Sequence, residues 1–523
     1  MKFKSICLTV LFAVGITACS DKKADDNIVA GTENDAAYIS LKVLTPSGSG
    51  TRASAETVAS DTENAIKTLK AVVFNSNYQV IKHSTVSDAV QSVTGFGSTG
   101  QNTTENTNAF KVPGNARYLL IIANPGTLYN AVLGGITAGM HFNNLNNAIT
   151  AASAAAAAAE ISNATAGYTM VNMGLGVADD NDVTSAAELC LIDLAGKVQV
   201  VGAGDGQYET AAEAQAAAET AANRVAVKIE RLTSKVEVVE KAGGATVPAD
   251  VTFSFTSWVL DVVNKSFYPW AKKVDLASVP SNSNFYTKNF YSIDPNYDNN
   301  IGIEYNPVTV TFPATADIDK PAYCVENTTK AGEQDNDKIT RVVVKATYYP
   351  NNWTAPADWY AYGNNTYETL ELMQAAYSDD TPPIDFNLRN ACDRFFQKVK
   401  ASDGTNIAAT NFVGLTQAML NAMGIANGGE LVKENDCILW YQKGLCYYFF
   451  AIRHDDAVTD NNAFAKYGLV RNNWYQCTIN SVSEAGTPWY PDVDDDPIDE
   501  TEGYISATIN IGPWVKWAHD VDL

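Results

Sequence analysis

Short segments in which apolar and polar residues alternate restrict the fold of this sequence more than any other feature. A period of two is typical of a β-strand with one buried face. The longest alternation runs from Val225 to Val239. Many short strands separated by turns rich in Gly, Pro and Asn favour β-sandwiches over a parallel α/β sheet. The sequence therefore predicts a mainly β protein, with further strands at 66–74, 109–112, 117–123, 251–255, 258–263, 308–312, 341–349, 437–441, 445–452 and 474–479.

Two alanine-rich stretches interrupt the strand signals of the first half. Residues 147–161 include an unbroken run from Ala154 to Ala159, and residues 209–222 combine alanine with glutamate and glutamine. Alanine has the highest helix propensity but buries little surface by itself. We therefore expect small helical insertions that pack on a sheet. Weaker helical signals lie at 366–376 and 417–423.

The charge balance argues against a nucleic-acid partner. The chain has 36 Lys and Arg against 59 Asp and Glu, which gives a formal net charge of -23. Phosphate binding needs clustered basic residues, and the sequence has no such cluster.

Residues suited to catalysis or metal binding are sparse. The chain has four histidines, scattered along its length, and no Cys-x-x-Cys pair, so a zinc site is not expected. No Gly-x-Ser-x-Gly, His-Glu-x-x-His or phosphate-loop pattern occurs. A catalytic pair of carboxylates stays possible because acids are abundant, but nothing selects one. We predict no enzymatic activity, no catalytic residue, no cofactor and no metal site.

The N-terminus has the pattern of an export signal. Lys2 and Lys4 precede a short apolar stretch, which ends in Ile-Thr-Ala-Cys19 before the chain turns polar. This pattern resembles a bacterial lipobox, in which the cysteine becomes the first residue and carries lipid. Residues 1–19 are therefore predicted to be a lipoprotein signal peptide, with Cys19 as the lipidation site. The alternative is an ordinary signal peptide with a coincidental cysteine.

A strand and a basic residue follow the signal. Residues 20–36 are small and polar, and Tyr38–Leu44 then alternates with Ile39, Leu41 and Val43 on one face. The Gly/Ser segment after this strand contains Arg52, in a kind of exposed segment that proteases attack.

Two other clusters each have two interpretations. Residues 492–500 are strongly acidic, but they lack the central glycine and the final glutamate of an EF-hand loop. A solvated loop is therefore favoured over a calcium site. The aromatic residues between Trp440 and Phe450 could stack on a sugar, although packing within strands is the commoner role.

Several stretches resemble segments of the Bacteroidales minor fimbrillins. They are residues 258–269, 323–328 and 466–475, and the lipobox, the Arg52 loop and Gly512-Pro-Trp514 agree in order and position. The similarity spans most of the chain and is weakest between residues 125 and 222.

The resemblance implies a subunit of a type V pilus with two tandem transthyretin-like β-sandwich domains. Such precursors reach the outer membrane as lipoproteins, and an Arg-specific surface protease then removes the N-terminal segment. Carried over to this chain, cleavage falls after Arg52 and frees Ala53. The mature subunits polymerise by donor-strand exchange into a surface fimbrium, together with accessory anchor and tip proteins.

The sequence is physically compatible with such an exchange. Loss of residues 20–52 would remove the strand Tyr38–Leu44 and open an apolar groove with unpaired backbone groups. The C-terminus is the expected donor, either from Tyr504 onward or only from Gly512 if residues 504–511 complete their own sandwich. The expected donor side chains are Ile505, Ile509, Ile511, Trp514, Val515 and Trp517.

The predicted organisation follows from these features. After the signal come a propeptide at 20–52, an N-terminal β-sandwich at 53–222, a C-terminal β-sandwich at 223–503 and a donor segment at 504–523. A C-terminal donor favours a shaft subunit serving adhesion and biofilm formation over a tip or anchor subunit. The other alternative is a surface glycan-binding lipoprotein, whose mature N-terminus would be lipidated Cys19 and not Ala53.

Overall fold

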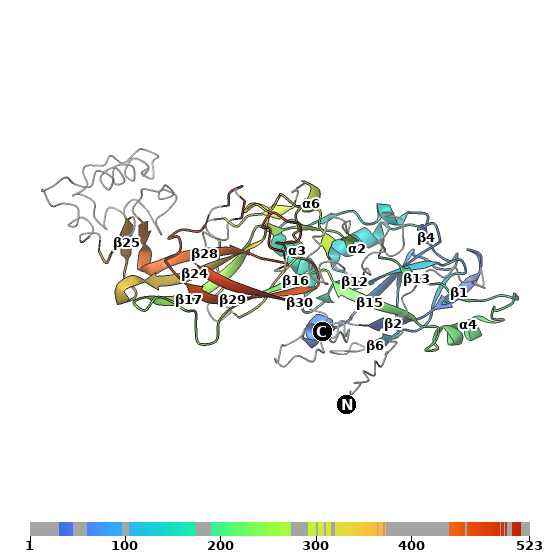
Figure 1. Ribbon diagram of the computed structural model, residues 1–523. Coiled ribbons are helices and arrows are strands. Elements are labelled where there is room, and N and C mark those ends of the chain that lie inside the picture. Colours follow the sequence, from blue (N-terminus) through green and yellow to red (C-terminus); the bar gives the residue numbers. More distant parts are fainter. Residues whose placement is uncertain are drawn as a thin grey trace, which may run out of the picture.

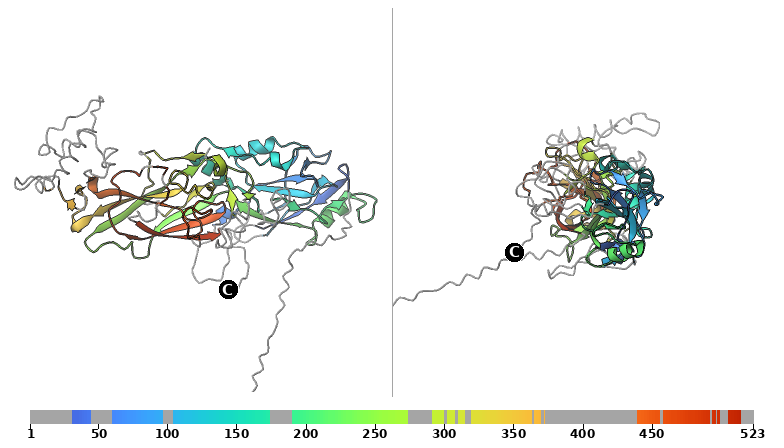
Figure 2. Two further views of the ribbon diagram at one scale, coloured as in Figure 1. Left: turned by 45° about the horizontal axis from the view of Figure 1, so that its top comes forward. Right: turned by 90° about the vertical axis from the view of Figure 1, so that its right-hand side faces the viewer.

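The protein is an elongated molecule with two β-rich regions arranged end to end (Figure 1). Seen along its long axis, the ribbon of these regions has a compact cross-section (Figure 2, right). The computed structural model describes residues 31–44, 60–96, 104–173, 190–273, 291–299, 302–307, 310–314, 319–362, 365–369, 372, 439–455, 458–491, 493–495, 497–498 and 505–513.

The first region is built on a nine-stranded sheet that is covered on both faces. Along β3, Leu69, Ala71 and Val73 face one apolar cluster, whereas Val72 and Phe74 face another. Two covered faces explain why the neighbouring strand β8 is apolar along most of its length. The strand order is β4 (Val80–Ile81), β3 (Leu69–Phe74), β8 (Tyr118–Ala123), β12 (Met170–Asn172), β15 (Val225–Arg231), β2 (Leu41–Leu44) and β6 (Thr104–Asn106), with β5 (Val90–Ser92) on β3 and β13 (Ile192–Asp193) on β8.

A small sheet and two helices cover the two faces. The three-stranded sheet β14 (Gln199–Val200), β1 (Ala36–Ile39) and β7 (Phe110–Pro113) contributes to the first cluster. Helices α2 (Thr127–Gly134) and α3 (Ala154–Ile161) contribute Tyr129, Leu133, Ala157 and Ile161 to the second. This face is thus a helix-on-sheet layer, in which alanine allows close approach.

The second region packs two antiparallel-rich sheets around one core. One sheet has the order β23 (Ala322–Cys324), β16 (Ser234–Glu240), β29 (Asn473–Val482) and β30 (Ile505–Pro513). The other has the order β17 (Thr252–Asp261), β24 (Arg341–Tyr349) and β28 (Leu445–Ala451). Val236, Trp258, Val344 and Tyr475 belong to the shared cluster between them.

Short ladders and helices complete the described part of the chain. The ladders are β10 (Ser162–Asn163) with β11 (Gly167–Tyr168), β18 (Val263–Asn264) with β22 (Ile303–Glu304), β19 (Ser266–Phe267) with β9 (Ile149–Thr150), β20 (Lys272–Lys273) with β21 (Ser292–Ile293), and β26 (Asn365–Tyr367), β25 (Trp359–Tyr362) and β27 (Leu439–Tyr441). The helices are α1 (Asp61–Asn64), α4 (Ala211–Ala218), α6 (Asn296–Asn299) and the 3-10 turns Phe142–Asn144, Pro350–Asn352 and Gln442–Gly444.

The predicted mainly β fold with small helical insertions is confirmed. Both alanine-rich stretches form helices, begun by the Ser153 side chain at α3 and by a Thr210–Glu213 capping box at α4. In the part of the chain described here, no helix is both long and apolar enough to cross a membrane.

Two local predictions were wrong. Residues 366 and 367, the start of the helix expected at 366–376, belong to β26 because they pair with β25, whereas Leu372 in the same range is helical. Residues 310–312, expected in a strand, pair with no neighbour and pack through Phe312 against Tyr447 and Tyr490. In both places a tertiary partner overrides the local pattern. The helix expected at 417–423 lies outside the described residues.

Candidate functional site

The three apolar residues of the N-terminal strand are fully buried. Ile39, Leu41 and Val43 expose no surface, and all three belong to the first apolar cluster. Ala37 precedes them with the same alternation and is equally buried. The stretch therefore forms part of the core of the first region.

This stretch is two strands and not the single one expected at Tyr38–Leu44. β1 pairs antiparallel with β7 and β14, whereas β2 pairs parallel with β15 and antiparallel with β6. The change of sheet falls at Ser40. Its hydroxyl donates to the Ala218 carbonyl oxygen at 2.6 Å, and its carbonyl accepts from the Val225 N–H at 2.9 Å.

Both strands are held on both sides. At Leu41, the N–H donates to the Thr107 hydroxyl at 2.9 Å and the carbonyl accepts from the Thr107 N–H at 3.0 Å. Removing residues 36–44 would therefore open four strand edges, on β6, β7, β14 and β15, above an exposed apolar cluster. Open edges of this kind bind extended chain segments.

Helix α1, at the start of the described segment 60–96, is held in place by several side-chain contacts. Ser60 forms a capping box with Glu63, whose backbone carbonyl accepts from Arg231 Nε at 3.0 Å. The Glu63 carboxylate accepts from the Tyr323 hydroxyl at 2.7 Å and lies 3.3 Å from Lys235 Nζ. Arg231 also donates to Asn64. The chain from residue 60 onward is thus attached to both β-rich regions, independently of β1 and β2.

Attraction to a nearby charge and hydrogen bonds outweigh the effect of burial on the pKa of Glu63 in α1. Burial alone would raise the pKa of Glu63, but Lys235 and the hydrogen bonds from Tyr323 and Ser60 hold that pKa below its usual value. Burial lowers the pKa of Arg231 to about 10, which still leaves the guanidinium charged at neutral pH. A buried pair of this kind fixes position more than it adds stability.

The C-terminal strand lies at the edge of its own sheet. β30 pairs antiparallel with β29, with Ile511 opposite Tyr475, Ile509 opposite Cys477 and Ile505 opposite Val482. The segment from Ile505 to Pro513 thus completes the second region within the same chain, which was one of the two alternatives for residues 504–511. Trp514, Val515 and Trp517 lie outside the described residues, as do Cys19, Arg52 and Ala53.

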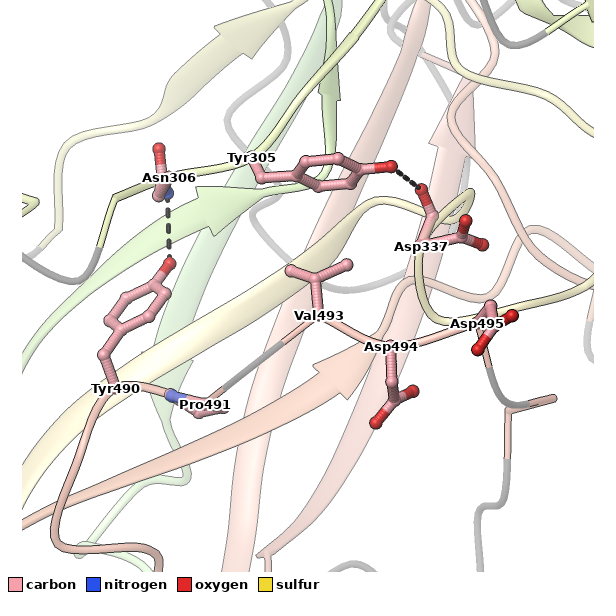
Figure 3. Close-up of a pocket in the computed structure, with 8 residues that line it drawn as sticks. All are labelled: Tyr305, Asn306, Asp337, Tyr490, Pro491, Val493, Asp494 and Asp495. Atoms are coloured by element: carbon pink, nitrogen blue, oxygen red, sulfur yellow. Dashed lines mark hydrogen bonds between the residues drawn. The ribbon is translucent and has the colours of Figure 1, made fainter. Parts of the chain in front are cut away.

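Three residues of the acidic segment at 492–500, Val493, Asp494 and Asp495, line a cavity of about 450 Å³ (Figure 3). In its wall the Tyr305 hydroxyl donates to the Asp337 carbonyl at 3.1 Å, and Asn306 donates to the Tyr490 hydroxyl at 3.2 Å. Burial is the largest of the effects that raise the pKa of Asp337. Asp494 accepts from Asn336 Nδ2 at 2.9 Å. Within the described ranges, no group of three or more His, Cys, Asp or Glu side chains is arranged to hold a metal ion.

The sequence did not single out three features of this site. The sheet change at Ser40 and the α1 anchor both depend on partners far away along the chain, Ala218 and Arg231. A serine between two apolar residues was a weak signal of the sheet change. Nothing in the sequence pointed to the third feature, the contact between Tyr38 and α4.

Two family models match the chain, one over each region. Residues 37–193 match the model described as major fimbrial subunit protein (FimA). Residues 440–520 match the model described as major fimbrial subunit protein type IV, fimbrillin, C-terminal. Both models describe fimbrial subunit proteins. The predicted fimbrillin resemblance is therefore confirmed, with the matching models describing major and not minor subunits.

Three of the solved structures that are similar to this chain are a cell adhesion protein and two fimbrial proteins. A candidate cell adhesion protein from Parabacteroides distasonis has 12% identity over 92% of this chain and 99% of its own, with a TM-score of 0.42. A fimbrilin from Porphyromonas gingivalis has 13% identity over 91% and 97%, with a TM-score of 0.37. The tip fimbrial protein Mfa3 from the same organism, truncated at its C-terminus, has 12% identity over 91% and 100%, with a TM-score of 0.33. At these TM-scores the solved structures carry no argument, and the similarity to fimbrial subunits rests on the two family models, which match residues 37–193 and 440–520.

A search among curated proteins found no match. The two family models support a structural subunit of a cell-surface fimbrium.

Proposed function

We propose that the chain is a shaft subunit of a type V pilus that polymerises by donor-strand exchange. A protease specific for arginine cleaves after Arg52, and the segment that ends there leaves together with β1 and β2. The vacated position is filled by the C-terminal segment of a second copy. The fimbrium formed in this way serves adhesion and biofilm formation.

The burial of Ile39, Leu41 and Val43 is the observation that carries this proposal. These residues lie upstream of the proposed cleavage site, and they are the part of the core that the cut would detach. Burying three such side chains contributes roughly 5–9 kcal/mol. An empty groove would be unstable by a similar amount, so a second chain that fills it binds strongly.

The remaining assignments follow from the sequence. The precursor is held at the outer membrane by lipid on Cys19 until cleavage releases it into the polymer. Anchor and tip fimbrial proteins are the expected partners at the ends of the filament. The division at residue 52 and the transthyretin-like character of each sandwich belong to the same proposal. β15 (Val225–Arg231) lies beyond the boundary expected at residue 222 but is part of the sheet of the first region, and β30 (Ile505–Pro513) lies beyond the boundary expected at residue 503 but is part of a sheet of the second region.

Replacing the cleavage residue tests the maturation step. Arg52→Ala should leave the lipidated precursor at the surface as a monomer, because the plug formed by β1 and β2 cannot leave. Electron microscopy of cells and electrophoresis of unboiled surface extracts would measure the loss of fibres. Lys23→Ala, which changes a basic residue of the same tether, is the control and should polymerise normally.

Normal fibres from Arg52→Ala would contradict the cleavage step. If the wild-type protein instead stays at the surface as a monomer with Cys19 as its N-terminus, the glycan-binding lipoprotein would be the better account.

A further inference from the structure

Helix α4 covers the side of β1 that faces away from the main core. Ala214 and Ala218 are fully buried, and they form a separate small cluster with Tyr38, which is itself buried. Val201 and Tyr208 pack against the same cluster. β1 is therefore enclosed on both faces, by the apolar cluster on one side and by α4 on the other. Figure 1 shows α4 and β1 together at one end of the molecule.

A direct hydrogen bond joins the end of α4 to the strand. The Ser40 hydroxyl donates to the carbonyl oxygen of Ala218, the last residue of α4, at 2.6 Å, and Ser40 is fully buried. The last carbonyls of a helix have no partner within the helix itself. The strand thus supplies a bond that the helix end needs, at the point where the chain changes sheets.

The helix has further attachments that do not depend on the strand. Glu219 Oε1 accepts from the Ala109 N–H at 2.7 Å, next to β7, and Lys197 Nζ donates to the Ala222 carbonyl at 2.6 Å. Asn223 Nδ2 donates to the Ala217 carbonyl at 2.9 Å. These contacts belong to residues that stay in the subunit when residues 20–52 leave, so α4 would remain in place over the vacated position.

We infer that α4 is a latch that retains the strand Ala36–Leu44 through Tyr38 and Ser40 and slows its departure. The inference depends on the proposed function, because a latch matters only if the strand is released. Edge pairing and core burial alone would hold the strand from its sides and its inner face. The helix also covers the outer face of the strand. The strand therefore cannot leave until α4 moves away from Tyr38.

The alanines of α4 give a matched pair of substitutions. Ala214 is buried against Tyr38, whereas Ala216, two residues further on, is exposed. Leucine and alanine both have high helix propensity. The larger side chain of Ala214→Leu should therefore not fit against Tyr38 and should displace α4 from the strand. Ala216→Leu adds the same side chain on the solvent side of the same helix.

The test measures how long the cut strand stays bound. Protein comprising residues 20–523 is cleaved after Arg52 with a protease specific for arginine, and the fraction of residues 20–52 still attached is followed by size exclusion and mass spectrometry. Ala214→Leu should release the fragment at least fivefold faster than wild type, and Ala216→Leu should match wild type. Equal rates in all three proteins would overturn the latch.

A compensating pair separates the latch from general destabilisation. Tyr38→Ala should also speed release, but Tyr38→Ala combined with Ala214→Leu should be slower than either change alone, because the leucine fills the space left by the tyrosine. Additive acceleration in the double variant would contradict a direct contact.

The same samples distinguish the latch from the proposed function. If the fragment leaves with the expected differences in rate but no polymer forms, the latch stands and donor-strand exchange fails. If the fragment leaves at the same rate in every variant and polymer still forms, donor-strand exchange stands and the latch fails.

Discussion

The N-terminal strands β1 and β2 and the C-terminal strand β30 all alternate in apolar residues, but they occupy different positions in their sheets. β1 and β2 have hydrogen-bonded neighbours on both sides and belong to a fully buried cluster. Among the residues that the structure describes, β30 has a single hydrogen-bonded neighbour, β29, and forms the edge of its sheet. A strand enclosed on both sides is part of the core and leaves a groove when it goes. An edge strand can be rearranged at lower cost, because only one ladder has to break.

This difference suggests a division of labour between the two strands. β1 and β2 are suited to stabilise the subunit before cleavage. The C-terminal segment is suited to pair with a neighbouring subunit. The anchor of α1 on Arg231 fits this division, since it holds the chain from residue 60 onward in place whether or not β1 and β2 are present.

The largest expected effect concerns the plug. Leu41→Ala should destabilise the precursor by about 2–5 kcal/mol, because it leaves a cavity in the core. Denaturant unfolding of the uncleaved protein measures this. Lys42→Ala, on the exposed side of the same strand, should change stability by less than about 0.5 kcal/mol.

The stability of the assembled fibres gives a second test of the same substitution. Fibres assembled from the Leu41→Ala precursor should be as stable as wild-type fibres, since the substituted residue is no longer in them. Fibres weakened to the same extent as the precursor would show that β2 remains in the polymer.

A smaller expected effect is a pH dependence of stability that arises in the second region. His454 lies in the region that contains β29 and β30, and its Nδ1 is 2.8 Å from the Tyr475 hydroxyl. Burial lowers the pKa of His454 from 6.5 to about 4. Between these values the unfolded chain binds a proton that the folded chain does not, so stability is lost as the pH falls from 6.5 towards 4.

A substitution isolates this contribution. His454→Gln should remove the acid-dependent loss, which amounts to about 3 kcal/mol or less. The quantity to compare is the difference in unfolding free energy between wild type and variant at each pH. The comparison is needed because burial raises the pKa of Asp294 to about 7, which makes stability fall as the pH rises over an overlapping range. A difference that does not change with pH would contradict a neutral buried His454.

Sequence patterns were sufficient for what depends on local periodicity. The burial of Ile39, Leu41 and Val43, the long strands from Val225 and the helices at 154–161 and 211–218 all follow from alternation or alanine content. Features that depend on distant partners were not predictable. Ser40 interrupts the strand because of Ala218, and β26 replaces the start of an expected helix because β25 lies beside it. The order of strands within each sheet is of the same kind.

The central claim is that the C-terminal segment of one copy fills the place that β1 and β2 leave in another. Truncation after Asn510 tests it most directly, because it removes the last three residues of β30 and the tail beyond them while six residues of β30 can still pair with β29. Thermal unfolding of the uncleaved variant checks that the monomer still folds. After cleavage at Arg52 the account predicts no polymer by electron microscopy, whereas fibres of wild-type length would contradict it.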